Sequence, residues 1–451
     1  MKSSILLVAF VFLSVSLLLA QENKITELSL RECVKVAIEK NINAQTARID
    51  YEKSGYKVDE TRAALLPKIS VNGNFQDNLK LPTTLIPGEF LGEPGTSVAL
   101  QMGAQYSTNA SIGINQVLFN QTAHTALQIS KKMEALNFLS IEKASEALAI
   151  EVSKLYFLSQ TTSKQKTLIE ENIARTKHIS DIIKLLVDNG MNKQVDYDRI
   201  TVNLENLYSQ LSNIEATHEQ QLNMIKYMLI IPLQETIELT DTTEMSLLQH
   251  TPQLISDFSN HIDIKMLESQ KEVNRLNQKM IADRSLPTLT FTGQYAYQGL
   301  RQSFKNYFQS SPENNWYPTS YFGLNLSIPL FDGGERRSKV KQAKLDFQKT
   351  EMTLYDTEEN LNVNYRNALS NYSNHKINVQ RQKENIALAE KVYRGTALKY
   401  REGLVTMTDL LQDEMGLNNA QASYLSALYN FKEAELKIMS LNGDITNLIK
   451  Q

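Results

Sequence analysis

The stretch LPTLTFTG at residues 286–293 decides the fold, because a second version of it, LPKISVNG, occupies residues 66–73. In both, a Leu-Pro pair precedes residues that alternate between apolar and polar. This alternation is typical of a β-strand with two different faces. The two stretches lie about 220 residues apart in a chain of 451 residues. The chain therefore contains the same strand start twice.

Other features recur at a shift of about 213 to 220 residues and in the same order. They are LFN at 118–120 with LFD at 330–332, Asn189-Gly190 and Asp196 with Glu402-Gly403 and Asp409, and an apolar helical seam that starts at Ile200 and again at Leu417. A repeat of this length indicates two copies of one structural unit. We expect residues 21–245 and 246–451 to form two repeats, each in the order helix, strand, loop, strand, long helix, helix.

Four segments have the two-residue period of β-strands, at about 68–77, 108–119, 288–298 and 320–331. In the third, Leu289 and Phe291 share one face, opposite Thr290. One interpretation is an antiparallel sheet that buries one face against a soluble core. The other is a set of membrane β-barrel strands, apolar toward lipid and polar toward a lumen. Small hydroxylic residues on the polar faces and aromatic residues at the ends of the apolar faces favour the barrel.

Four strands alone cannot stand in a membrane, because an open sheet leaves unpaired backbone groups along both edges. Each such group costs several kcal/mol in hydrocarbon, so two open edges cost on the order of tens of kcal/mol. This exceeds the stability of an ordinary domain. The strands must therefore close into a barrel with strands of other subunits, and barrels of eight and of twelve strands are both feasible.

The sequence also predicts helices, at 121–187, 196–230, 253–284, 333–401 and 408–441. From Ile200 an apolar seam alternates steps of four and three residues as far as Met228, and a second seam runs from Leu417 to Ile438. A sustained period of about 3.5 residues indicates coiled-coil packing. At about 1.5 Å per residue the two longest helices each reach roughly 100 Å, several bilayer thicknesses. They must therefore project into an aqueous space.

Composition and the N-terminal segment narrow the functional classes. Residues 1–20, with Lys2 ahead of a long apolar run, have the pattern of a signal peptide for export. No later apolar run approaches the length of a spanning helix. A formal net charge of −3 gives no support for nucleic-acid binding, and a single cysteine, Cys33, excludes an internal disulfide. The residues before Cys33 are not those expected ahead of a lipidated cysteine, so we expect it within a helix.

The sequence shows no catalytic or metal-binding pattern. The six histidines lack the close spacing of metal ligands, and neither a nucleophile motif nor a phosphate loop is present. His218 falls on the first apolar seam, where we expect a buried polar residue that fixes helix register. We therefore expect neither enzymatic activity nor a cofactor.

A short segment joins the last strand to the last long helix. Pro329 has no N–H for a β-ladder, which suits the end of a strand. Asp332 can cap the following helix, and Gly333 and Gly334 permit a sharp change of direction. An ordinary turn would use the same residues, so this junction alone does not select a fold.

Two glycines mark turns between helices. Gly190 and Gly403 each lie between two helical segments and are expected at the tips of helical hairpins. Asp196 and Asp409 follow these glycines by six residues. Each is expected in the first turn of a helix, where the helix dipole stabilises an acidic side chain.

Three motifs resemble those of one known family. They are SIPLFDGG at 327–334, YREG at 400–403 followed by DLL at 409–411, and LSLRECVKVA at 28–37. With the repeat order, they are similar to the TolC family of outer-membrane efflux and secretion channels over nearly the whole chain. The resemblance implies an α+β membrane protein, a homotrimer in which each protomer gives four strands to one 12-stranded outer-membrane β-barrel. It also implies a long coiled-coil α-helical tunnel that continues the barrel into the periplasm.

The same resemblance implies roles for the hairpin tips. In that family the matching positions line a constricted periplasmic aperture, where an acid of one hairpin bonds a tyrosine of the other. By this match Asp196 would pair with Tyr400, and Asp409 would form an acidic ring across the three-fold axis. The chain departs from the family pattern at Val195, Val405 and Gln412. One polar latch is therefore missing, and closure is expected to rest on the Asp196–Tyr400 pair and on apolar contact.

The resemblance implies the outer-membrane channel of a tripartite efflux or type I secretion system, a passive exit duct for solutes or polypeptides. Its partners would be a periplasmic adaptor (membrane fusion) protein and an inner-membrane pump or ABC transporter. The alternative is a periplasmic coiled-coil scaffold or adaptor without a membrane barrel, although such a protein has no reason to repeat aromatic-ended strands. Export of metal ions, of drugs and of polypeptides are all compatible with the sequence.

Overall fold

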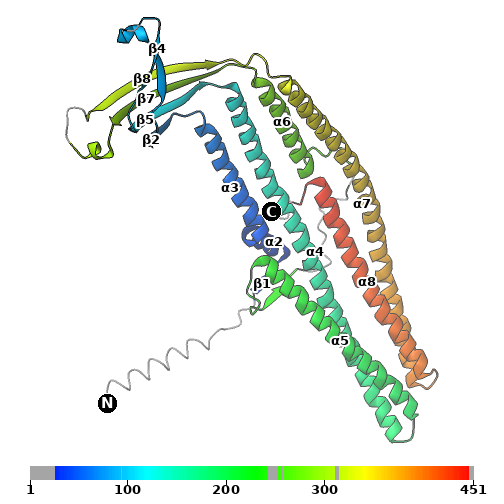
Figure 1. The fold of residues 1–451 in the computed structure, drawn as a ribbon. Coiled ribbons are helices and arrows are strands. Elements are labelled where there is room, and N and C mark those ends of the chain that lie inside the picture. The colour runs from blue at the N-terminus through cyan, green and yellow to red at the C-terminus, as the bar shows by residue number, and fades with distance from the viewer. Residues whose placement is uncertain are drawn as a thin grey trace, which may run out of the picture. The chain divides into compact units, whose positions relative to one another are not determined.

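The computed structural model describes residues 26–92, 94–241, 252, 254–255, 257–309 and 314–445 (Figure 1). The expected signal peptide at 1–20 lies outside these residues. The chain divides into two compact units. The helical unit consists of Met1–Tyr51, Asn137–Glu268 and Met352–Gln451, and the sheet unit consists of Glu52–Leu136 and Ser269–Glu351.

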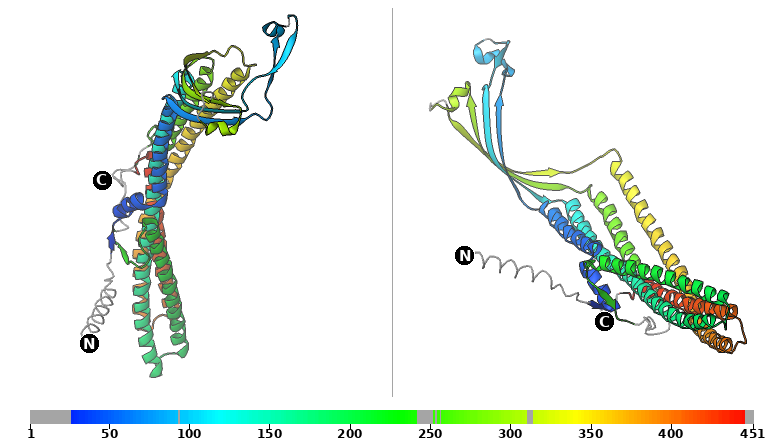
Figure 2. Two further views of the ribbon diagram at one scale, coloured as in Figure 1. Left: turned by 60° about the vertical axis from the view of Figure 1, so that its left-hand side comes forward. Right: turned by 90° about the horizontal axis from the view of Figure 1, so that it is seen from below.

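The sheet unit is built on one antiparallel sheet. Its strands are β2 (Lys68–Asp77), β5 (Tyr106–Phe119), β7 (Thr288–Arg301) and β8 (Trp316–Ser327), paired in the order β2-β5-β7-β8. Figure 2 shows these strands side by side in a curved sheet. Lys68 lies opposite Asn115, and Gly293 lies opposite Phe322. The sheet therefore joins strands from both predicted repeats.

The apolar side chains of the edge strands lie on an uncovered surface. Ile69 and Val71 of β2 are 68% and 77% exposed, and Phe322 and Leu324 of β8 are 84% and 66% exposed. A sheet that packed on a soluble core would bury these side chains. Within the described residues, β2 and β8 each pair along one side, so both edges of the sheet are open.

The last strand differs from the prediction of 320–331. β8 starts earlier, at Trp316, and ends at Ser327, so Pro329 lies beyond it. The partner strand explains the end, because Ser327 pairs with Thr288, the first residue of β7, and Pro287 before it has no N–H to extend the ladder. Pro318 interrupts the sequence pattern at the other end, and an edge strand tolerates it.

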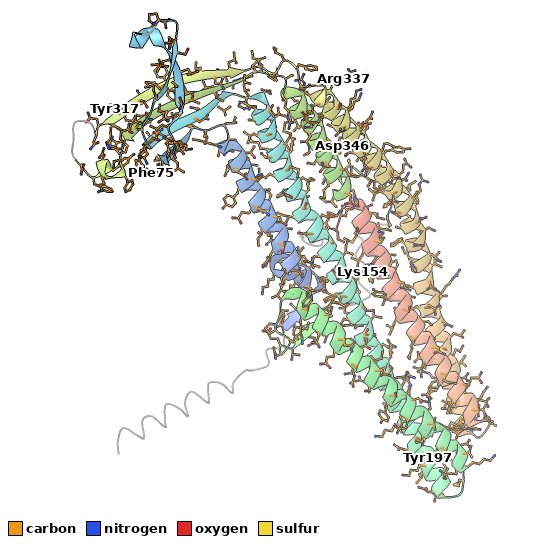
Figure 3. The ribbon with its side chains drawn as sticks, viewed as in Figure 1. Phe75, Lys154, Tyr197, Tyr317, Arg337 and Asp346 are labelled. Carbon is orange, nitrogen blue, oxygen red and sulfur yellow. The ribbon has the colours of Figure 1, made fainter. Side chains whose placement is uncertain are left out.

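The sequence does not predict the small hairpin of β3 (Thr83–Pro87) and β4 (Ser97–Gln101), because each strand is too short to show a clear alternation. Short 3₁₀ helices lie at Gly88–Leu91 and Phe304–Tyr307. Phe75, labelled in Figure 3, stacks on Tyr106 with ring centroids 6.1 Å apart and meets Phe304 edge-on at 6.0 Å. These aromatic contacts tie the 3₁₀ helix after β7 to the adjacent ends of β2 and β5.

Helices precede and follow the strands. α3 (Ile42–Ala63) leads to β2 and α6 (Ile262–Asp283) leads to β7, while α4 (Gln121–Asp188) follows β5 and α7 (Glu335–Arg401) follows β8. Within the sheet unit, Thr125 Oγ1 of α4 donates to Asp283 of α6 at 2.5 Å. Asn274 Nδ2 of α6 donates to Thr350 of α7 at 2.8 Å. These bonds hold α6 against both long helices.

α6 is shorter than the helix predicted at 253–284. Asp257 Oδ1 accepts the N–H of Ser259 at 2.9 Å, and His261 Nδ1 accepts the N–H of Asp263 at 3.2 Å. Such local bonds from side chain to backbone favour a turn and then a helix start over a continuous helix. Residues 253 and 256, which fall in the predicted segment, lie outside the described residues.

The helical unit contains α2 (Leu30–Lys40), α5 (Gln194–Leu229), α8 (Met407–Asn442) and a parallel pair of short strands, β1 (Thr26–Leu28) and β6 (Ile237–Leu239). Ser29 and Glu32 form a capping box that starts α2. Cys33 follows within this helix, as predicted, and packs in a core with Val34 and Tyr156. Burial raises the pKa of its thiol to about 12, so the thiol is protonated and unreactive.

The predicted apolar seams lie on the buried or half-buried sides of their helices. Ile200 and Met228 of the first seam and Leu417 and Ile438 of the second are all buried. His218 is half-buried rather than enclosed, and its pKa is lowered by desolvation and then by the charge of Lys166. Among the helices that the structure describes, none has the length and hydropathy of a membrane span.

Candidate functional site at the helical hairpin tips

Both predicted tip glycines end a helix in the left-handed conformation. Gly190 has φ of +71° and Gly403 has φ of +72°, a region that other residues enter at a cost. After each, the next N–H reaches back to cap the helix: Met191 N donates to Leu186 O at 2.7 Å and Leu404 N donates to Lys399 O at 2.9 Å. This bond pattern satisfies the last carbonyls of α4 and α7 and turns the chain into a hairpin.

Asp409 serves the start of α8. Its carboxylate accepts the N–H of Thr406 at 2.8 Å, and the Thr406 hydroxyl oxygen accepts the N–H of Asp409 at 3.2 Å. This is a capping box, and hydrogen bonds from Thr406 hold the pKa of Asp409 below its usual value. The residue is therefore ionised and fixed in place at the tip. Its predicted acidic ring needs neighbouring protomers and stays a prediction.

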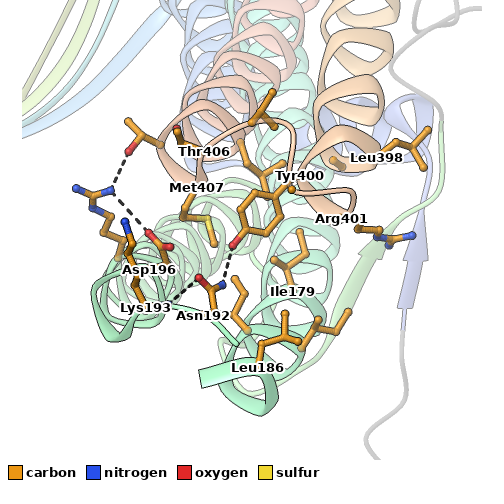
Figure 4. Close-up of a pocket in the computed structure, with 18 of the residues that line it drawn as sticks. Ile179, Leu186, Asn192, Lys193, Asp196, Leu398, Tyr400, Arg401, Thr406 and Met407 are labelled. Carbon is orange, nitrogen blue, oxygen red and sulfur yellow. Dashed lines mark hydrogen bonds and ion pairs between the residues drawn. The ribbon is translucent and has the colours of Figure 1, made fainter. Parts of the chain in front are cut away.

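The structure gives Tyr400 a different partner from the predicted one. Asn192 Nδ2 donates to Tyr400 Oη at 3.2 Å, between the two hairpins (Figure 4). Asp196 Oδ1 instead lies 3.9 Å from Arg199 Nη1 in an ion pair. Arg199 Nη1 also donates to Thr408 Oγ1 of the other hairpin at 2.9 Å. Two polar contacts thus join the tips.

The pKa of the Tyr400 hydroxyl is affected by residues of both hairpins. Desolvation is the main reason that its pKa is raised, and the negative charge of Asp196 adds to the shift, whereas the bond from Asn192 opposes it. Asp196 therefore lies close enough to act on Tyr400 electrostatically, although the hydrogen bond belongs to Asn192. The sequence signal for Asn192 is its place two residues after the tip glycine.

An apolar cluster supports the tips. Its buried members are Ile183, Ile200, Tyr393, Met407, Leu410 and Leu417. Two of the departures from the family pattern, Val195 and Val405, lie outside this cluster but line the space between the tips; Val195 is 55% exposed and Val405 is half-buried. The expectation of apolar contact between the hairpins therefore has a physical basis within a single chain.

Sequence reasoning missed a buried carboxyl group next to this cluster. Glu414 is 2% exposed; it accepts a bond from Thr176 Oγ1, and Asn203 Nδ2 donates to it at 3.0 Å. Burial raises its pKa, while the bond from Thr176 and the charge of Arg175 oppose the shift. A weak signal was present, because Glu414 lies four residues after Leu410 and three before Leu417, spacings that place it on the same side of the helix as these two apolar residues.

The residue beside it also has a partner within the hairpin. Thr396 Oγ1 of α7 donates to Asp413 of α8 at 2.6 Å. Asp413 directly follows Gln412, one of the three positions at which this chain departs from the family pattern that it resembles. Its carboxylate is therefore engaged between two helices of the same hairpin.

The strand-to-helix junction shows the capping that the sequence predicts. Asp332 accepts the N–H groups of Gly334 at 3.1 Å and of Arg336 at 3.3 Å. Gly333 and Gly334 have φ of +64° and +86°. Because both glycines are outside helical geometry, α7 begins at Glu335 rather than at 333 as predicted.

A cavity of about 1030 Å³ lies between the tips, lined by residues of α4, α5, α7 and α8. The Asn192–Tyr400 contact lies in its wall (Figure 4). The tips thus combine two hairpins, polar contacts between them and an open space.

Comparison with known proteins gives a consistent result. The profile of the family described as outer membrane efflux protein matches residues 34–229 and 259–444. The outer membrane protein TolC of Escherichia coli (strain K12) is 20% identical over 429 residues, which cover 90% of this chain and 80% of that protein.

Solved structures share the fold. CusC, from a study of folding and transmembrane channel formation, superposes with a TM-score of 0.74 at 14% identity and covers 91% of both chains. The open state of the MtrE outer membrane channel of Neisseria gonorrhoeae gives a TM-score of 0.71 at 17% identity, covering 92% of this chain and 88% of that one.

Proposed function

Because this chain belongs to the outer membrane efflux protein family, we propose that it assembles as a homotrimer with one 12-stranded β-barrel, each protomer supplying β2, β5, β7 and β8. The protein is an outer-membrane channel for efflux or secretion that extends into the periplasm. The family is one of channels rather than of enzymes. The alternative of a periplasmic scaffold without a barrel has no observation in its favour.

The main support for the shared barrel comes from the open edges and the exposed apolar face of the four-stranded sheet. Both edge strands are open, and Val71 on β2 and Phe322 on β8 lie on an exposed apolar face. In hydrocarbon the unpaired edge groups would cost on the order of tens of kcal/mol, so the edges must pair with strands of other protomers. In the order β2-β5-β7-β8 each strand is antiparallel to the next, so β8 of one protomer can continue the alternation with β2 of another.

Matched element lengths support two structural repeats at 21–245 and 246–451. α4 has 68 residues and α7 has 67, while α5 and α8 have 36 each. In each half, two barrel strands precede one long and one shorter helix. Three copies of this paired design would place six long hairpins around one axis, which is the tunnel we propose.

Family members work with periplasmic adaptors and inner-membrane pumps. We infer that an adaptor protein and an inner-membrane pump or ABC transporter serve this chain as well. A passive channel of this kind needs no cofactor. In its closed state, the residues around Tyr400 and a ring of Asp409 side chains would narrow the aperture and restrict passage. The left-handed backbone turns at Gly190 and Gly403 would hold both groups at the tip.

A disulfide experiment tests the trimer. In a Cys33→Ser background, Asn72→Cys on β2 is combined in turn with Gly323→Cys, Asn325→Cys or Ser327→Cys on β8. We expect at least one pair to give covalent dimers and trimers on a non-reducing gel of outer membranes. Each single-cysteine variant is the matched control, because a β2–β8 disulfide needs both strands.

Membrane fractionation and gel mobility before and after heating provide a second readout. A channel trimer should be found in the outer membrane and should change mobility on heating. A soluble protein of monomer mass, with none of the cysteine pairs crosslinked, would contradict the proposal.

A further inference from the structure

We propose that the cavity between the hairpin tips is a binding site for an amphipathic organic anion, with an apolar body and one carboxylate or sulfonate group. The site lies within the helical unit and would be occupied by a small molecule. A molecule held there would lie against the Asn192–Tyr400 contact that joins the two hairpins.

The cavity has the size of a ligand site. Its volume of about 1030 Å³ is at the upper end of the roughly 300–1,000 Å³ typical of small-molecule pockets. Both hairpins contribute to the lining, through Ile179 and Leu186 on one side and Leu398 and Met407 on the other (Figure 4). A bound molecule would therefore contact both hairpins at once.

The apolar lining is open to a ligand. Leu398 and Met191 are 61% and 76% exposed, although both belong to the cavity wall. Covering such side chains removes apolar surface from water and contributes about 25 cal/mol for each Å² buried. The ligand's body would thus be held by an aliphatic wall.

The charge of the lining selects an anion. Among the described residues of the wall, five carry a positive side chain and one, Asp196, carries a carboxylate; the cations are Arg175, Lys193, Arg199, Arg394 and Arg401. Three of the cations have polar partners: Arg175 bonds Asn172, Arg199 faces Asp196 and bonds Thr408, and Arg394 pairs with Glu390.

Two cations remain available, one on each hairpin. Lys193 and Arg401 form no ion pair with any residue in the described ranges. A cationic ligand would be repelled by them, and a wholly apolar ligand would leave their charges uncompensated. An anionic head group on an apolar body matches both properties of the wall. The Arg401 guanidinium also offers a planar fork for two oxygens of a carboxylate or sulfonate.

Titration calorimetry on the intact protein in lipid nanodiscs tests this site. The probe is naphthalene-2-sulfonate, and empty nanodiscs supply the background. We expect saturable binding of one molecule per protomer that weakens as ionic strength rises. The neutral analogue 2-naphthalenemethanol should bind about tenfold more weakly, because it lacks the charge.

A double variant tests whether Lys193 and Arg401 bind the anionic head group of the ligand. Lys193→Gln with Arg401→Gln should weaken binding of the sulfonate about tenfold and leave binding of the alcohol unchanged. Lys399→Gln is the matched control, since Lys399 is an exposed cation on the same helix but lies outside the wall. Equal affinity in the double variant and in wild type would overturn the proposal.

Two leucines of α7 test the apolar part. Leu398→Asp places a carboxylate in the wall and should abolish binding, whereas Leu388→Asp makes the same change at a 60% exposed position outside the wall and should not. Heat-dependent gel mobility reports that each variant still assembles. Absence of saturable binding to an assembled wild-type channel would contradict the ligand site while leaving the channel function intact.

Discussion

At the residue scale, Tyr400 links the two hairpins through one hydrogen bond. Tyr400→Phe removes the hydroxyl that accepts from Asn192 at 3.2 Å. A hydrogen bond of this kind contributes about 1 kcal/mol, so the closed tip should become several-fold less populated. We expect higher resting conductance in planar bilayer recordings. Tyr355→Phe, at an exposed site on α7, is the matched control.

The identity of the partner can be tested separately. Asn192→Ala should raise conductance as much as Tyr400→Phe, and the double variant should add little, because both changes remove one bond. Asp196→Asn should have the smaller effect. A larger effect of Asp196→Asn would favour the pairing implied by the family resemblance, and unchanged conductance in Tyr400→Phe would exclude a latch.

Glu146 predicts a pH dependence of stability. Desolvation, followed by the charge of Glu142, raises its pKa from 4.5 to about 7, with Lys265 opposing and Asp263 adding to the shift. Below pH 4.5 the group is protonated in the folded and unfolded states alike. As pH rises from 4.5 to 7 the unfolded state ionises first, so stability falls over this window and then levels off.

Glu146→Gln should flatten this dependence. The difference in melting temperature between pH 5 and pH 8 is expected to be smaller in the variant than in wild type. Glu151→Gln, which changes an exposed carboxylate on the same helix, should keep the wild-type difference. An identical pH profile in Glu146→Gln would show that this carboxyl group is not the one responsible.

At the element scale, the two faces of β2 should respond differently to charge. Val71→Lys puts a charge on the apolar face that we place against lipid, where it costs about 2–4 kcal/mol near the middle of the bilayer. Asn72→Lys changes the next residue, which points to the opposite face. We expect fewer heat-modifiable oligomers in outer membranes for Val71→Lys and near-normal amounts for Asn72→Lys. The reverse order would mean that the polar face contacts lipid.

At the scale of the whole molecule, both hairpin tips are expected to contact a periplasmic adaptor. A photoreactive amino acid at Met191 or Leu404, which are 76% and 68% exposed, should give adducts that contain an adaptor protein in cells. The control is the same amino acid at Leu345, which is 64% exposed in the sheet-unit part of α7. Adducts of equal yield at all three sites would argue against docking at the tips.

Most helices and strands could be predicted from the sequence because their apolar residues recur with a regular period. The alternation at 68–77 coincides with β2, and the four-and-three spacing from Ile200 marks the buried side of α5. Two boundary errors arise where local bonds or a partner strand set the end of an element: the Asp257 turn shortens α6, and the start of β7 ends β8. Neither effect leaves a periodic signal.

The candidate site at the hairpin tips could be predicted only in part from the sequence. The tip glycines follow from sequence because a left-handed turn needs a residue without a side chain. The exchange of Asp196 for Asn192 as partner of Tyr400, and the burial of Glu414, depend on how α5 and α8 approach each other. Contacts between residues about 200 positions apart are fixed by packing.

By itself the sequence determined the repeat, the two-faced strands, the long helices and the glycine turns, since each arises from interactions between near neighbours along the chain. Tertiary structure decided which polar groups meet between the hairpins, where the edge strands end, and that an open, positively charged cavity lies between the tips. These depend on the distances between separate elements, which side-chain packing sets and no local pattern encodes.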